Sequence, residues 1–378
     1  MQRVARSPRS LTPPDVGILL AVPGRVPVFD DHRVSTPMNS RRTTSVARRS
    51  TLVALLAALA GAACASSSAS SSITEGPTPL NPEKASRYVF SYFKGNGEDG
   101  LHLAYSEDGY AWRALNDDKP FFHPSVGKEK LTRDPSIVRG PDGMFHMVWT
   151  AGWNEKGFGY AESRDLITWF NERYVPVMES EPTAMNTWAP EIFYDSLRAR
   201  YQIFWASTIP GRFPGDSAGG GGKYNHRLYF TTTKDFKTFA PTKLLYDRGF
   251  SVIDADMMKD GTRYVMFLKD EREKPAQKNI RIAYAERPEG PWSQATRPIT
   301  GDYWAEGPTV LKVGWEYIVY FDRYRDHRYG AIVSTDLQNW EDASEELVVP
   351  DGMRHGTAFA VPRTDAERLL ANERRMTP

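Results

Sequence analysis

Short apolar runs separated by tight turns recur from about residue 87 to about residue 362 of this chain. Asp142-Gly143 and Asp260-Gly261 each lie between two such runs, which is the strongest local signal for a β-hairpin. Few stretches place apolar residues at i, i+3, i+4 and i+7 for long enough to form a core helix. The pattern predicts an all-β domain of antiparallel strands.

One short sequence phrase returns five times, at intervals of about 50–70 residues. Each copy is a small-residue strand end, a turn with Asp or Glu, and an aromatic residue three or four positions on. The copies begin at Ala104, Ala161, Thr231, Ala283 and Ile332. A second periodic element lies between the copies and opens with a polar residue before its first apolar run. These openings are at 134–137, 189–192, 253–256, 306–309 and 355–358.

Five units of four antiparallel strands predict a five-bladed β-propeller. The first unit starts at 88–93 without a first strand of its own. Residues 355–361 can supply that strand, which would close the ring and remove an exposed edge. A β-sandwich is the alternative architecture, but it does not explain five copies in register. We expect the recurring tryptophans of the fourth strands to pack within the blades: Trp112, Trp169, Trp292 and Trp340.

The innermost strands of a propeller line its axis, so the five polar openings are expected to converge on one rim. The second strand of each blade runs antiparallel to the first, so its end returns to the same rim. The long insertion 209–227, with its glycine-rich centre at 219–222, leaves from such an end and would overhang this face. Candidates at the second-strand ends are Phe93, Trp153, Thr208, Lys269, Asp270 and Arg323.

The first 63 residues have the composition of a targeting sequence. Arginine pairs at 41–42 and 48–49 precede the apolar run 52–63, which is too short to span a bilayer. Residues 1–37 have no place in such a signal, so we predict that the true start is Met38. Cys64, the single cysteine, follows the apolar run and resembles the lipidated cysteine of bacterial lipoproteins. An ordinary signal-peptidase cut next to Cys64 is the alternative.

This reading divides the chain into an upstream extension with signal peptide (1–63), a serine-rich tether (64–86), the propeller (87–362) and a C-terminal tail (363–378). The expected location is extracytoplasmic: periplasmic, anchored to the outer membrane through a lipid on Cys64, or secreted. We expect a monomer. Residues 1–63 hold nine of the 48 Lys and Arg but three of the 47 Asp and Glu, so the remainder is net negative. A nucleic-acid partner is therefore not expected, and a neutral, sugar-like ligand fits better.

Four of the openings, RDPSI from 133, WAPE from 188, IDA from 253 and EGP from 306, resemble the signature blocks of glycoside hydrolase family 43 in order and spacing. The resemblance implies exo-acting hydrolysis of arabinofuranosides, xylosides or galactosides with inversion at the anomeric carbon. It further implies a general base at Asp134, an acid at Glu306 and a third carboxylate, Asp254, that tunes the acid. Ala255 stands where the family often has proline, and Asp256 competes with Asp254 for the third role.

Inverting hydrolysis needs an ionised carboxylate to activate water and a protonated one to serve the leaving oxygen. The acid must keep its proton near neutral pH, so we expect Asp254 to raise the pKa of Glu306 by like-charge repulsion. The further candidates for contact with the sugar are Trp153, Trp188, Glu191, Lys269, Arg323 and His355.

No cofactor is expected to be required for the chemistry. In the resembling family a histidine of the last blade often lies near an ion in the central channel, so His355 is a candidate beside a structural Ca²⁺ ion. A related phosphorylase or transglycosidase remains open because Arg323, Arg328 and Arg354 could form a phosphate pocket. A catalytically silent sugar-binding propeller is a third class, although all three carboxylates are present.

Overall fold

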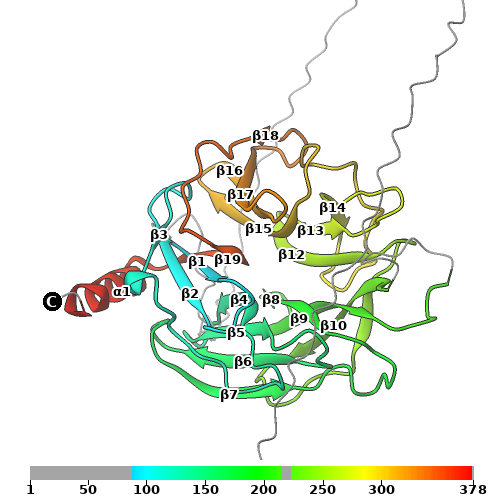
Figure 1. The fold of residues 1–378 in the computed structure, drawn as a ribbon, viewed down its shortest axis with the longest axis horizontal. Coiled ribbons are helices and arrows are strands. Elements are labelled where there is room, and N and C mark those ends of the chain that lie inside the picture. Colours follow the sequence, from blue (N-terminus) through cyan, green and yellow to red (C-terminus); the bar gives the residue numbers. More distant parts are fainter. Residues whose placement is uncertain (1–86, 215–222, 377–378) are drawn as a thin grey trace, which may run out of the picture. The chain divides into compact units, whose positions relative to one another are not determined.

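The computed structural model describes residues 87–214 and 223–376, and these form a five-bladed β-propeller, as predicted (Figure 1). Blade 1 consists of β19 (Arg354–Val361), β1 (Arg87–Phe93), β2 (His102–Ser106) and β3 (Arg113–Ala114). Blade 2 consists of β4 (Arg133–Arg139), β5 (Phe145–Thr150), β6 (Phe158–Ser163) and β7 (Trp169–Val175). Blade 3 consists of β8 (Trp188–Asp195), β9 (Arg200–Thr208), β10 (His226–Thr233) and β11 (Lys243–Tyr246). Blade 4 consists of β12 (Val252–Asp260), β13 (Arg263–Asp270) and β14 (Asn279–Ala285), and blade 5 of β15 (Glu306–Val313), β16 (Glu316–Arg323), β17 (Arg328–Ser334) and β18 (Glu341–Asp342).

The last strand closes the ring, as predicted. β19 pairs antiparallel with β1, from Arg87 opposite Val361 to Phe93 opposite Arg354. Each of the five innermost strands, β19, β4, β8, β12 and β15, contacts its neighbour on either side, so the circle is complete. Figure 1 shows these strands gathered around the centre. Closure leaves blade 1 without an unpaired inner edge.

The recurring sequence phrase forms one repeated turn. In blade 2, Ser163 Oγ accepts a hydrogen bond from the backbone N–H of Leu166. Asp165 Oδ1 accepts hydrogen bonds from the backbone N–H groups of Ile167 and Thr168. The same arrangement occurs around Asp108, Asp235 and Asp336. A Ser or Thr and an Asp two residues later satisfy backbone donors locally, so this turn can be read from sequence.

Blade 4 differs from the prediction of four strands in every unit. In place of a fourth strand, an irregular segment makes backbone hydrogen bonds to β14 from Ser293, Thr296 and Ile299. The Ser293 and Thr296 hydroxyls accept further N–H groups of β14. Proline at 291 and 298 and the side-chain hydrogen bonds replace a regular ladder here.

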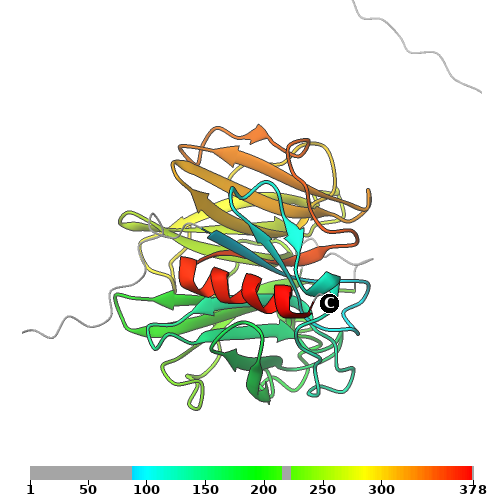
Figure 2. The ribbon, with the colours of Figure 1, turned by 90° about the vertical axis from the view of Figure 1, so that its left-hand side faces the viewer.

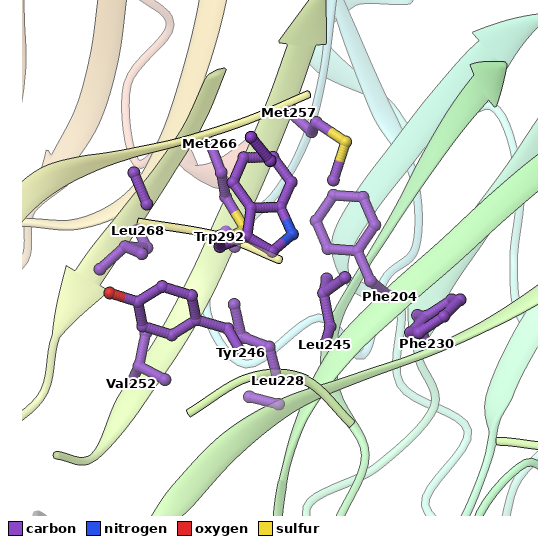
Figure 3. Packing of buried hydrophobic residues seen from close by; sticks show 14 of the residues in the cluster. Phe204, Leu228, Phe230, Leu245, Tyr246, Val252, Met257, Met266, Leu268 and Trp292 are labelled. Atoms are coloured by element: carbon purple, nitrogen blue, oxygen red, sulfur yellow. The ribbon is translucent and has the colours of Figure 1, made fainter. Parts of the chain in front are cut away.

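The core lies between neighbouring blades. Trp292 packs among apolar side chains of blades 3 and 4, including Phe204, Met257 and Met266 (Figure 3). Trp112 is equally buried, while Trp169 and Trp340 are partly buried against their clusters. The tryptophans therefore pack within and between blades, as expected.

The C-terminal segment, which the sequence presented only as a tail, contains a helix, α1 (Arg363–Met376). Ala366 and Leu369 are buried against blades 1 and 2, and Figure 2 shows α1 lying along the side of the propeller. Within the described part of the chain, no helix has the length and apolar character needed to cross a membrane. Met38, the signal, Cys64, the tether and the glycine run 219–222 lie outside the described residues.

Candidate active site

The innermost strands carry their functional residues on bulges. Pairing slips by one or more residues at Asp134, at Ala189, at Asp254 and at Gly307. At each slip one residue adopts a left-handed backbone, with φ of 52°, 45°, 48° and 58° in that order. Such a backbone is unfavourable for residues other than glycine, and a bulge re-aims its side chain. The fold thus tolerates backbone strain at the bulges that turn the side chains of Asp134 and Asp254.

Asp134 is held as a carboxylate. Its Oδ2 accepts a hydrogen bond of 2.7 Å from Thr150 Oγ1, and its Oδ1 lies 3.2 Å from His355 Nδ1. Burial opposes ionisation, but the attraction and hydrogen bond of protonated His355 outweigh burial and lower the pKa of Asp134 to about 2. Thr150 also accepts the backbone N–H of Ala189, which ties blade 2 to blade 3. Asp134 is therefore ionised at neutral pH.

His355 is a buried cation. Burial alone would lower its pKa, but the carboxylates of Asp134, Asp254 and Glu191 raise it to about 9. Its ring lies directly against Gly307, where an added Cβ would stand 2.3 Å from His355 Cγ. Among residues 87–214 and 223–376, no three His, Cys, Asp or Glu side chains are placed to hold a metal ion. The structural Ca²⁺ ion suggested beside His355 stays a prediction from the family resemblance.

Asp254 lies next to Glu306 along the rim. Its Oδ2 accepts the backbone N–H of Gly307 at 3.1 Å. Burial raises the pKa of Asp254 to about 6, although His355 and Lys269 act in the opposite direction. Asp256, the competing residue, lies two positions further along β12 and accepts the N–H groups of Met257 and Val310. Asp254 rather than Asp256 therefore borders Glu306.

Glu306 lies between two cations. Its Oε2 is 2.9 Å from Lys269 Nζ, and its Oε1 is 3.3 Å from Arg354 Nη2. Burial opposes ionisation, but Lys269 first, then His355 and Arg354, lower the pKa of Glu306 below its usual range. The expectation that the pKa of Glu306 is raised is wrong, because repulsion from Asp254 is weaker than the attraction of Lys269, His355 and Arg354. The raised pKa belongs to Asp254 instead.

Lys269 and Arg354 each form an ion pair with a second acidic side chain. Lys269 is almost fully buried, and its ammonium also contacts Glu271 at 2.9 Å. The carboxylates of Glu306, Glu271 and Asp254 outweigh the effect of burial and raise the pKa of Lys269 well above its usual value. Arg354 makes a second ion pair through its Nε with Asp322. Glu306 is thus fixed by side chains from β13 and β19.

An aromatic wall stands on the Asp134 side of the rim. Trp153, 40% exposed, packs edge-to-face against Trp188 with ring centroids 5.5 Å apart. The Arg133 guanidinium lies between the rings of Trp153 and Phe93, at 4.4 and 4.6 Å from their centroids. Trp188 also packs against His226, whose pKa burial lowers to about 3, so that ring is neutral. Partly exposed aromatic faces of this kind suit the apolar face of a sugar.

Several predicted residues do not join this group. Glu191 lies further along β8, where its carboxyl accepts hydrogen bonds from Ser136 and Thr357 and burial raises its pKa. Arg323 turns away, pairs with Asp326 and stacks over Tyr303 at 4.0 Å. The remaining candidates also have other surroundings: Asp270 pairs with Arg272 and Arg281, Thr208 is buried, and Arg328 pairs with Glu345.

Sequence reasoning missed Thr150 and Asp322 and gave Arg354 only a tentative phosphate role. Thr150 and Asp322 lie at or next to the ends of second strands, so the rim argument would have found them had it included the neighbouring positions. The close contact of Arg354 with Glu306 joins residues of two blades and has no local signal.

Comparison with known proteins supports a carbohydrate-active site. A family model described as "Probable glycosyl hydrolase domain", of the type related to glycoside hydrolase family 43, matches residues 83–367. The chain belongs to this glycoside hydrolase family. The family resemblance is therefore confirmed.

Named relatives of this glycoside hydrolase are distant. The alpha-L-arabinofuranosidase of Bifidobacterium longum subsp. longum is 24% identical over 217 residues, 52% of this chain and 20% of that protein. The chain thus spans about a fifth of that relative's length. The structure of alpha-L-arabinofuranosidase from Lactobacillus brevis is 18% identical, with a TM-score of 0.43 over 56% of this chain and 72% of that one. The endo-1,4-beta-xylanase of Bacteroides thetaiotaomicron is 12% identical, with a TM-score of 0.49 over 70% of this chain and 94% of that one.

Proposed function

We propose that this protein is an exo-acting, inverting glycosidase that removes terminal arabinofuranosyl, xylosyl or related galactofuranosyl or galactosyl residues from oligosaccharides or polysaccharides. The observation that carries the proposal is the pairing of an ionised, buried Asp134 with a second carboxyl pair, Asp254 and Glu306, at one rim. Inverting hydrolysis requires carboxyl groups in two different protonation states. The lowered pKa of Asp134 and the raised pKa of Asp254 support this proposal.

In the proposed reaction Asp134 takes a proton from water as the water oxygen bonds to the anomeric carbon. The glycosidic bond breaks on the other side, and Glu306 gives its proton to the leaving oxygen. His355 and Thr150 orient Asp134 and stabilise its charge in the free enzyme. The wall formed by Trp153 and Trp188 would support the terminal sugar.

The proton on the acid needs a source, because the pKa of Glu306 lies below its usual range. Asp254, with a pKa of about 6, carries a proton over the weakly acidic range and lies next to Glu306. Two interacting carboxyls titrate as a pair, so one shared proton can reside on Glu306 in the reactive state. A substrate that displaces Arg354 from Glu306 Oε1 and excludes water would favour that state.

The alternatives have weaker support. Arg323, Arg328 and Arg354 each pair with an acid, so they do not combine into one cationic phosphate pocket. A silent sugar-binding protein would not need an ionised and a protonated carboxyl at the same rim. We also propose, from the N-terminal sequence, that the protein is exported.

Leaving-group dependence tests the assigned roles. Purified protein is screened against nitrophenyl furanosides and pyranosides, then against the matching disaccharide. Asp134→Ala should lower kcat for every substrate by about 100-fold or more, because water activation is always needed. Glu306→Ala should spare dinitrophenyl glycosides, whose leaving group needs no proton, far more than the disaccharide.

Asp326→Asn, an exposed carboxylate on the same face, is the matched control and should leave both rates unchanged. A folded Asp134→Ala or Glu306→Ala protein that hydrolyses the disaccharide at the unmodified rate would refute the roles.

A further inference from the structure

A cleft of about 640 Å³ lies between the outer parts of blades 4 and 5. One wall consists of β14 and the irregular segment that replaces the fourth strand of blade 4, and the other is the turn that joins β17 to β18. Its volume is within the range of small-molecule sites. None of its lining residues belongs to an innermost strand, so the cleft is separate from the candidate active site.

We propose that this cleft is a second carbohydrate-binding site, which holds a neutral polysaccharide chain on the outside of the propeller. The inference goes beyond the proposed function, because it does not depend on the roles of Asp134, Asp254 or Glu306. Three features of the cleft carry it: a strand edge that is closed to peptides, two fixed aromatic rings, and exposed polar side chains without protein partners.

The edge of β14 is closed to a further strand. Its outward-facing backbone groups belong to Ile280, Ile282 and Tyr284. Their N–H groups donate to hydroxyls of the irregular segment, those of Thr300, Thr296 and Ser293 in that order. Their carbonyl groups accept backbone N–H groups of the same segment. Strand addition, by which a peptide binds a free sheet edge, is therefore not available, and a ligand of this cleft must be held by side chains.

Two partly exposed aromatic rings line the cleft, and both are fixed in place. Trp340 packs edge-to-face against Phe267, with ring centroids 6.0 Å apart. The Tyr284 hydroxyl donates to the backbone carbonyl of Leu337 at 3.2 Å, which joins the two walls of the cleft. Partly exposed aromatic rings can pack against the apolar C–H faces of sugar units. Because these rings are already held by the protein, little side-chain entropy is lost when a ligand binds.

The polar side chains of the cleft suit the hydroxyl groups of a neutral sugar. The Gln338 amide and the Arg297 guanidinium are exposed, and within residues 87–214 and 223–376 neither has a hydrogen-bond or ion-pair partner. Both can donate hydrogen bonds to sugar hydroxyls. The other cation, Arg263, is paired with Asp260 at 3.0 Å. An anionic polymer would therefore meet a single unpaired cation, which gives it little electrostatic advantage over a neutral chain.

Affinity electrophoresis of the whole chain, in gels that contain arabinan, arabinoxylan or galactan, measures binding at this site. Trp340→Leu removes the aromatic face and keeps an apolar side chain against Phe267. Because Trp340 also contributes to packing, the second variant, Gln338→Ala with Arg297→Ala, changes only exposed side chains. Trp315→Leu is the matched control, since Trp315 is 82% exposed and lies outside the cleft, in the turn between β15 and β16. Hydrolysis of a nitrophenyl glycoside reports the active site alone, because this substrate has no polysaccharide chain.

The proposal predicts that at least one of the three polysaccharides retards the unmodified protein and that both cleft variants bind it about fivefold more weakly or worse. Both variants should hydrolyse the nitrophenyl glycoside within about twofold of the unmodified rate. Trp315→Leu should change neither property.

Unchanged retardation in both cleft variants, or no retardation of the unmodified protein, would overturn the cleft proposal and leave the proposed function intact. Retardation by polygalacturonate alone would identify an anion site and also overturn it. A protein that binds a neutral polysaccharide through the cleft but hydrolyses no glycoside would support the second site and refute the proposed function.

Discussion

Replacing Lys269 with methionine should raise the pKa of Glu306 and move the alkaline limb of the pH–rate profile to higher pH. In the structure the Lys269 ammonium lies 2.9 Å from Glu306 Oε2 and is the largest influence that keeps Glu306 ionised against burial. The variant removes a positive charge and keeps a side chain of similar length. With less attraction for its anionic form, Glu306 holds its proton to higher pH.

The size of the shift follows from the geometry. Opposite charges about 4 Å apart attract by about 4 kcal/mol at an effective dielectric constant of about 20, and one pKa unit corresponds to about 1.4 kcal/mol. Arg354 and His355 remain as cationic neighbours, and the Glu306 side chain is 20% exposed. We therefore expect an upward shift of about 1–2 pKa units rather than the full Coulomb value.

The assay is kcat/KM against pH for a disaccharide, because that ratio reports the free enzyme and a poor leaving group needs the acid. Lys278→Met is the matched control, since Lys278 is an equally buried lysine that contacts Glu271 rather than Glu306. It should leave the limb in place, and Lys269→Arg should keep the limb close to its original position. Loss of a sugar contact would change the height of the profile but not its limb. A limb that stays fixed or moves to lower pH in Lys269→Met would refute the reasoning.

Three further predictions concern the rest of the chain. His355→Gln should lower the free energy of unfolding by up to about 3 kcal/mol, because the His355 pKa is raised to about 9. This loss, seen in urea titrations, should be full below about pH 6.5 and should vanish as pH rises through about 9, where the unmodified protein also loses the ion pair with Asp134. Gly307→Ala should abolish activity and lower the melting temperature, because the new Cβ meets the His355 ring and φ is 58°, whereas Gly314→Ala, with open space around it, should cost less. Mass spectrometry of protein from the native host should find a mature N-terminus at or near Cys64, and a soluble chain that still begins at Met38 would contradict export.

The sequence allowed most of the fold to be predicted because the repeated elements are local. The hydrogen bonds around Asp165 and its equivalents involve residues within three positions, so four of the five copies carry the same pattern. The outer edge of blade 4 has no such pattern, and three strands resulted where four were expected. The helix α1 is short of apolar residues and is stabilised by Ala366 and Leu369 packing on blades that are distant in sequence.

The candidate site was predictable only in part. Asp134, Asp254 and Glu306 follow from their positions at the starts of inner strands, and these three do converge. The lowered pKa of Glu306 could not be predicted from the sequence, because Lys269 and Arg354 approach its carboxylate from two other strands. The direction of a side chain at the end of a second strand also depends on its rotamer and on the shape of the following loop. For this reason Arg323 pairs with Asp326 instead of facing the axis.

The central claim is a single displacement at the anomeric carbon, with Asp134 activating water and Glu306 protonating the leaving oxygen. Proton NMR during the first turnovers of a substrate of known anomeric configuration tests this claim most directly. The account predicts that the first sugar released has the opposite configuration and then mutarotates to equilibrium. A first product with the same configuration as the substrate would require a covalent intermediate on an enzymatic nucleophile and would contradict the assignment of Asp134 as a base.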